Sequence, residues 1–189
     1  MIKIVGGKHR GRALETPEGH DVRPTANRAR EALFNILVHA NWHADGTSPL
    51  IDARVLDAFA GSGALGLEAL SRGAAHATFL DNDARSIKLI GENIRKLGET
   101  AAAKVVRGDA TRPPPGRDPC DLVFLDPPYR SGQAVPALLA LAEAGWLKPG
   151  AIATVELAHN EDLVPPRGFE AIDERRYGAA KIVIVKYAP

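Results

Sequence analysis

A four-residue run, Asp126-Pro127-Pro128-Tyr129, places an acid, two prolines and an aromatic ring directly after the apolar segment DLVFL. Consecutive prolines fix the backbone and remove two N–H donors, so the carboxylate of Asp126 and the carbonyl of Pro127 form a rigid pair of acceptors. Such a pair can bind both protons of an aromatic amine and draw its nitrogen toward tetrahedral geometry, which frees the lone pair. The ring of Tyr129 can stack on the base that carries the amine. The run therefore indicates chemistry at an exocyclic amino group.

A glycine-rich loop follows the apolar segment VLDAFA. Gly61, Gly63 and Gly66 fit the G-x-G-x-x-G pattern, which brings backbone amides close to a cofactor. Proteins that bind NAD or FAD share this pattern, and Asp81 stands about 20 residues further on, where they place a ribose-binding acid. Asp57, just before the loop, disfavours a pyrophosphate and suits the cationic end of S-adenosylmethionine, directly or through water. A nucleotide-cofactor oxidoreductase stays open at this point, although it leaves the later tetrapeptide unexplained.

The order of these motifs resembles class I S-adenosylmethionine-dependent methyltransferases over about residues 53–187: D-x-F-x-G-x-G-x-x-G, an acid after a second strand, and GDA after a third. The resemblance implies S-adenosylmethionine as cofactor, with the glycine loop at its methionine part, Asp81 at the ribose, and later residues at the adenine. The implied cofactor-binding residues are Asp57, Phe59, Gly61, Gly63, Asp81, Asn82, Asp109 and Ala110. A plain turn role for Asp109 is the alternative.

The tetrapeptide itself resembles the (D/N/S)-P-P-(Y/F/W) signature of amino-methylating enzymes. This resemblance implies that Asp126, Pro127, Pro128 and Tyr129 are the catalytic residues.

The elements that must position these residues alternate along the chain. We expect helices at about 64–72, between Asp83 and Gly98, and at 132–145. The expected strands are 55–60, 76–81, 103–108, 120–126, 151–157, 169–177 and 179–187. Alternation predicts a parallel sheet covered on both faces, whereas the last two strands are joined too briefly for a crossover and should pair antiparallel. With the resemblance, this predicts an α/β Rossmann-like class I methyltransferase fold with a seven-stranded, mostly parallel sheet whose last strand is antiparallel.

The first 40 residues have a different character. Residues 1–15 read as a β-hairpin, 16–24 as a linker, and an amphipathic helix follows with Thr25 as its expected cap. We expect residues 1–40 to form a basic hairpin and helix packed on the core, and 41–189 to form the methyltransferase domain. Residues 1–30 hold seven lysines and arginines against three acids, although the whole chain carries only +1. This imbalance favours a polyanionic partner, with a solvated basic face as the alternative.

Four blocks in this order, IVGGKHRGRAL, VRPTANRAREALFNIL, VLDAFAGSGALGLEALSRGA and DLVFLDPPY, resemble the bacterial small-subunit ribosomal RNA guanine-N2 methyltransferases of the RsmD type. The match spans nearly the whole chain and implies N2-methylguanine in 16S rRNA as the product, made on the small subunit or an assembly intermediate. The resemblance also implies that the hairpin grips RNA phosphates and that Arg28, Arg30 and Asn35 shape the pocket, with a solvated helix face as the alternative for both arginines. The residues expected at the RNA are Lys8, His9, Arg10, Arg12, Arg23, Arg28 and Arg130.

Composition limits the other classes. A single cysteine excludes an intramolecular disulfide and a cysteine-rich zinc site, and the six histidines lack metal-ligand spacing. No apolar run approaches the ~20 residues that cross a bilayer, and the N-terminus lacks the apolar core of a signal peptide. We therefore expect a cytoplasmic, metal-free monomer. An adenine-N6 methyltransferase acting on DNA or RNA remains the main alternative, and a non-catalytic RNA-binding assembly factor is another.

Overall fold

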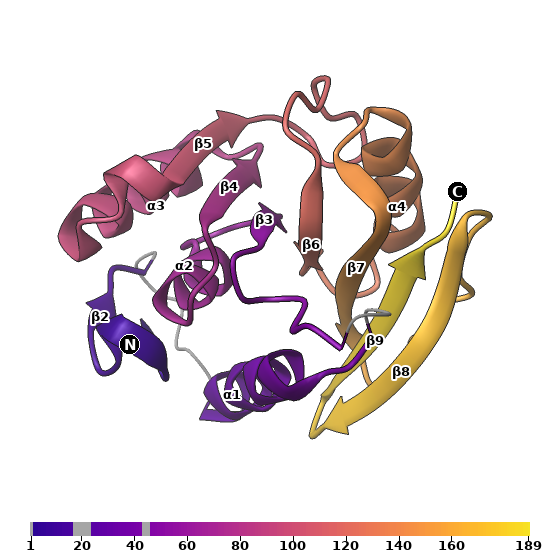
Figure 1. Cartoon of the computed structure of the whole chain (residues 1–189), viewed down its shortest axis with the longest axis horizontal. Coiled ribbons are helices and arrows are strands. Elements are labelled where there is room, and N and C mark those ends of the chain that lie inside the picture. Colours follow the sequence, from indigo (N-terminus) through magenta and orange to yellow (C-terminus); the bar gives the residue numbers. More distant parts are fainter. Residues whose placement is uncertain (1, 17–23, 43–45) are drawn as a thin grey trace.

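A seven-stranded sheet forms the centre of the molecule (Figure 1) in the computed structural model, which describes residues 2–16, 24–42 and 46–189, with the backbone alone at 24–28. Its strands are β3 (Arg54–Ala58), β4 (His76–Asp81), β5 (Ala103–Arg107), β6 (Cys120–Leu125), β7 (Leu147–Ala158), β8 (Phe169–Tyr177) and β9 (Ala180–Tyr187). The α-helices are α1 (Pro24–His39), α2 (Ala64–Ser71), α3 (Ala84–Leu97) and α4 (Ala134–Glu143). The remaining elements are β1 (Ile2–Lys3), β2 (Ala13–Leu14) and the 3-10 turns η1 (Gly7–His9) and η2 (Thr100–Ala102).

The strand order is β5-β4-β3-β6-β7-β9-β8. The first five strands in this order run parallel to one another, and β9 pairs antiparallel with both β7 and β8. This arrangement confirms the predicted sheet. The antiparallel strand lies inside the sheet because its run KIVIV is buried, whereas the polar β8 takes the edge. A charged edge strand also resists pairing with other chains.

Each face of the sheet has its own apolar core. Leu33, Phe34 and Leu37 of α1 pack with residues of α2 and α3 on one face, in a cluster that includes Phe79 and Phe124. On the other face α4 covers a second cluster that includes alternate residues of the same strands, such as Leu80 and Leu125. This division follows from the period of two in a strand, and it explains why the central strands are apolar throughout.

Local signals set the ends of two helices. Asp83 caps α3 by accepting a hydrogen bond from the amide of Arg85, and Gly98 ends the helix in the left-handed region at φ 74°, both as predicted. Helix α1 begins at Pro24, so Thr25 is the second residue of the helix, and the prediction that Thr25 caps it was wrong. Proline suits the first helical turn because its missing N–H is not needed there.

The N-terminal hairpin is docked on α2. Strands β1 and β2 pair antiparallel, as predicted, and the amides of Val5 and Gly6 each donate to the carboxylate of Glu68 at 2.8 Å. Glu68 is fully buried and is also paired with Arg72. Ile4 and Leu14 of the hairpin join the same core cluster as α1 and α2. The hairpin and α1 thus share a core with the sheet, and the division into residues 1–40 and 41–189 stays a prediction.

Candidate active site

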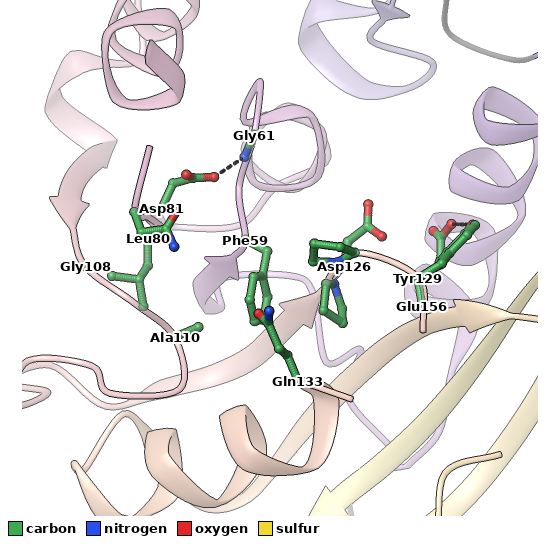
Figure 2. Close-up of a pocket in the computed structure, with 13 residues that line it drawn as sticks. Phe59, Gly61, Leu80, Asp81, Gly108, Ala110, Asp126, Tyr129, Gln133 and Glu156 are labelled. Atoms are coloured by element: carbon green, nitrogen blue, oxygen red, sulfur yellow. Dashed lines mark hydrogen bonds between the residues drawn. The ribbon is translucent and has the colours of Figure 1, made fainter. Parts of the chain in front are cut away.

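A cavity of about 620 Å³ opens at the carboxyl ends of the parallel strands, where Figure 2 shows its lining side chains. Sites in open α/β sheets typically form at this end, and the volume is in the usual range for a bound cofactor. The lining residues are Phe59, Gly61, Leu80, Asp81, Asn82, Gly108, Ala110, Asp126, Pro127, Pro128, Tyr129, Gln133 and Glu156. Residues predicted for the cofactor and residues predicted for the amine therefore share one space.

The glycine loop is held by the acid at the end of the neighbouring strand. The amide of Gly61 donates to Asp81 Oδ2 at 2.8 Å, a bond drawn in Figure 2, while Asp81 Oδ1 accepts from the amide of Asp83. Gly61 has φ 56°, which favours glycine. At Gly66 a Cβ atom would lie 2.4 Å from the ring of Phe79, so glycine lets α2 pack closely on β4. The second strand's acid thus shapes the loop as well as lining the cavity.

Three of the predicted cofactor residues are not among the lining residues: Asp57, Gly63 and Asp109. The carboxylate of Asp57 is 1% exposed and accepts from the amide of Gly66 at 2.8 Å. Asp109 accepts from the amide and hydroxyl of Thr111, which is the turn role named as its alternative. The contact of all three with a cofactor stays a prediction, whereas the side chains of Asp57 and Asp109 each have a hydrogen-bond partner inside the protein.

Burial raises the pKa of Asp57 to about 8, with the nearby charge of Asp81 adding to the effect and the Gly66 amide opposing it. An acid whose pKa is raised on folding contributes stability that is full below its unfolded value, near 3.8, and is lost as pH rises through about 8.

Asp57→Asn should remove this pH dependence, because asparagine can still accept from Gly66 but does not ionise. Urea unfolding at pH 5.5 and 8.5 gives the free energy of unfolding of both proteins. The difference between the variant and the wild type should change in the variant's favour as pH rises, by at most about 1.4 kcal/mol per pH unit. Parallel pH profiles for the two proteins would contradict the prediction.

The amine-binding end is formed by the loop after β6. Asp126 is exposed to the cavity, Pro127 is buried beneath it, and Tyr129 is 45% exposed. The hydroxyl of Tyr129 donates to Glu156 Oε1 at 2.7 Å, as drawn in Figure 2. Asp126 and the ring of Tyr129 are therefore accessible from the cavity, and the buried Pro127 is among its lining residues.

Glu156 is a lining residue that the sequence analysis missed, as is Gln133 of the segment before α4. The register of β6 and β7 pairs Leu125 with Val155, which places Glu156 beside Asp126. One signal was available in the sequence, because Glu156 is a lone charge in the apolar strand segment AIATVEL. Its position at the carboxyl end of a parallel strand could have marked it as a candidate.

Two acids at this end of the cavity have raised pKa values. For Asp126 the causes are desolvation by the surrounding protein, then the charges of Glu156 and Asp57. For Glu156 burial raises the pKa, while the Tyr129 hydroxyl and the charge of Arg30 act in the opposite direction. Carboxylates held in this way are stronger proton acceptors than free ones, a property typical of functional sites.

The predicted basic residues lie in different environments. Arg30 is 8% exposed and donates to the carbonyl of Lys3 at 2.6 Å, so the alternative of a solvated helix face was wrong for this residue. In the hairpin, Lys8 and His9 both pair with Glu99, and Arg12 donates to the carbonyl of Lys96. These three basic side chains of the hairpin, which were expected to bind RNA, therefore already have partners within the protein.

The remaining residues that were predicted to contact RNA are either exposed or outside the described part of the chain. Arg10 and Arg130 are exposed, Arg23 lies outside the described residues, and so does the side chain of Arg28. The backbone amide of Arg130 donates to Glu161, and Arg130 has φ 58°. RNA contact at all these positions stays a prediction.

The sheet order, the glycine loop with its acid, and the tetrapeptide on the same cavity define a class I methyltransferase, the class that uses S-adenosylmethionine. A family model described as conserved hypothetical protein 95 matches residues 2–186, and the chain belongs to this family. The sequence is 40% identical over 157 residues to ribosomal RNA small subunit methyltransferase D of Escherichia coli K12, covering 82% of this chain and 74% of the relative. It is 35% identical over 182 residues to the protein of the same name from Haemophilus influenzae, covering 94% and 89%.

A solved structure gives the same result for the fold. The Escherichia coli protein yhhF, described as a candidate methyltransferase, superposes with a TM-score of 0.81 at 35% identity and covers 99% of this chain and 98% of its own. These findings confirm the predicted family and enzyme class, and they disfavour the oxidoreductase alternative.

The described residues lack two further kinds of feature. They contain no group of three or more histidine, cysteine, aspartate or glutamate side chains placed to hold a metal ion. Within the same residues, none of the helices has the length and apolar character needed to cross a membrane.

Proposed function

We propose that this protein transfers a methyl group from S-adenosylmethionine to the N2 amine of a guanine in small-subunit ribosomal RNA. The observation that carries the proposal is the single cavity running from Asp81 to Tyr129, which joins a cofactor site to an amine site. The Escherichia coli and Haemophilus relatives are named as small-subunit ribosomal RNA methyltransferases, which supports the substrate class. The four sequence blocks support guanine-N2 as the position.

The lining of the cavity fits the cofactor. Asp81 offers a carboxylate for ribose hydroxyls, and Asn82, Leu80 and Ala110 form a polar and apolar rim suited to adenine. When bound, S-adenosylmethionine supplies an electrophilic methyl group on its sulfonium sulfur. The loop at Gly61, which lines the cavity, and the acid at Asp81 would hold it at the end of the cavity opposite Tyr129.

The residues of this chain then act on the base. The carboxylate of Asp126 and the carbonyl of Pro127 accept hydrogen bonds from the amine, which orients its lone pair, and the ring of Tyr129 stacks on the base. As positive charge develops on the nitrogen, Asp126 stabilises it, and its raised pKa suits it to take up the proton that the amine loses.

RNA phosphates would be bound by exposed basic residues. Arg10 of the hairpin and Arg130 beside the tetrapeptide are well placed because both are exposed, whereas the exposed Lys8 would have to share its charge with Glu99. We propose that the substrate is the small subunit or an assembly intermediate, and that the protein acts in the cytoplasm as a monomer.

The proposal is tested by identifying the methylated nucleoside. The protein is incubated with radiolabelled S-adenosylmethionine and small ribosomal subunits from a strain lacking the endogenous enzyme, and the RNA is digested to nucleosides. We expect label in N2-methylguanosine, and none when Asp126→Ala is used. Label in N6-methyladenosine would reassign the base, and an absence of label in any RNA would overturn the proposed function.

A further inference from the structure

Glu156 lies beside the residues that are proposed to hold the amine. It lines the cavity beside Asp126, because β6 and β7 pair in parallel with Leu125 opposite Val155. Residues two apart in a strand share a face, so Glu156 points to the same side of the sheet as Ile152, which packs in the cluster with α1. Figure 2 shows the carboxyl groups of Asp126 and Glu156 in the same part of the cavity, with Tyr129 beside them.

Although burial raises the pKa of Glu156, a hydrogen-bond donor and a positive charge close to it act in the opposite direction. The Tyr129 hydroxyl already donates to its Oε1, and the positive charge of Arg30 acts on it from α1. An ionised carboxylate is an acceptor only, with about four lone-pair positions on its two oxygens. One donor from Tyr129 therefore leaves capacity for a donor from a ligand.

Guanine and adenine differ at the atom next to the amine. Guanine presents N1–H beside its N2 amine, a row of donors, whereas adenine presents the N1 lone pair beside its N6 amine. The acceptors Asp126 and Pro127 can bind either amine, and so they do not choose between the bases. An acceptor beside them does choose, because a half-buried carboxylate facing the N1 lone pair of adenine meets repulsion and loses a hydrogen bond.

We propose that Glu156 is the residue that selects guanine, by accepting a hydrogen bond from N1–H while Asp126 and Pro127 hold the N2 amine. The inference rests on the proposed function and adds to it the source of its base specificity. Glu156 is thus a specificity residue that contacts the substrate, and its bond with Tyr129 keeps its carboxylate in place.

The test uses a base that keeps the amine but lacks N1–H. Small subunits are reconstituted with 16S rRNA in which a synthetic segment carries either guanine or 2-aminopurine at the methylated position. Radiolabel transfer is measured as kcat/KM for each base. We expect the wild type to prefer guanine by about 100-fold. Glu156→Gln should lower the rate with guanine. It should preserve the rate with 2-aminopurine better, because the glutamine amide can donate to N1 of that base. The preference for guanine should therefore fall at least tenfold.

Two matched variants separate this role from others. Glu170→Gln makes the same chemical change at an exposed site on β8 and should leave both rates unchanged. Tyr129→Phe keeps the ring and removes the bond to Glu156. If Glu156 acted only by positioning Tyr129, this variant would lose base preference as Glu156→Gln does. We expect it to retain most of the preference while its rates fall.

The outcomes distinguish the inference from the proposed function. Guanine labelled by the wild type, with an unchanged base ratio in Glu156→Gln, would overturn the inference alone. No label in guanine subunits would overturn the proposed function instead. A melting temperature of Glu156→Gln close to that of the wild type shows that altered rates do not come from unfolding.

Discussion

Asp126→Ala should lower kcat by about 1000-fold, because it removes an acceptor that acts as charge develops on the amine nitrogen. The carboxylate of Asp126 faces the cavity, and desolvation by the surrounding protein, with the charges of neighbouring acids, raises its pKa and makes it a stronger base than a free aspartate. The Pro127 carbonyl and Tyr129 ring remain, so RNA affinity should change little. Single-turnover methyl transfer with saturating enzyme measures this effect separately from binding.

Asp126→Asn provides the matched comparison. Asparagine keeps the shape and one carbonyl acceptor but loses the charge, so we expect an intermediate fall of roughly 10- to 100-fold. If alanine retained more than a tenth of the wild-type rate, the amine would have to be held elsewhere. Equal rates for alanine and asparagine would show that the charge, and not the acceptor, is what matters.

Asp81→Ala should raise the Kd for S-adenosylmethionine by at least about 100-fold, since a carboxylate bonded to two ribose hydroxyls contributes strongly. The same change frees the amide of Gly61, so the glycine loop also loses its fixed position. Calorimetric titration of the cofactor into each protein measures the affinity directly, without RNA.

The control for this prediction is a substitution at Asp83, two residues after Asp81 in the chain. Asp83 caps α3 and pairs with Arg85, and it is not a lining residue of the cavity. Asp83→Ser keeps a good cap, so cofactor affinity should stay within about threefold of the wild type. A similar loss of affinity in both variants would mean that disturbing the start of α3 is sufficient, and that Asp81 does not bind the ribose.

Features with a local cause were predicted well from the sequence. Asp83 and Gly98 mark the ends of α3 by their own backbone preferences, and the short turn at Gly178 forces β8 and β9 to pair antiparallel. The tetrapeptide needed no more than its own residues to be identified. In each case the determining interaction lies within a few positions along the chain.

Features that depend on distant pairing were not predictable in this way. Glu156 is 30 positions from Asp126, and only the parallel pairing of β6 with β7 brings them together. Lys8 and His9 both pair with Glu99, which lies just after the end of α3, so a charge count of the hairpin overstates its free charge. Asp57 was expected beside a ligand, but the close packing of α2 brings the Gly66 amide to its carboxylate.

The order in which the central strands occur also bears on how the protein folds. Strand β3 pairs with β6, and the hydrogen bond from the Arg54 amide to Asp121 joins residues 67 apart in the chain. Closing so long a loop is slow, and domains dominated by such pairings fold on the order of milliseconds to seconds. During synthesis the segment that carries the glycine loop leaves the ribosome before the one that carries the tetrapeptide. The two halves of the cavity are therefore joined late, when the newly made second half pairs with a first half already present.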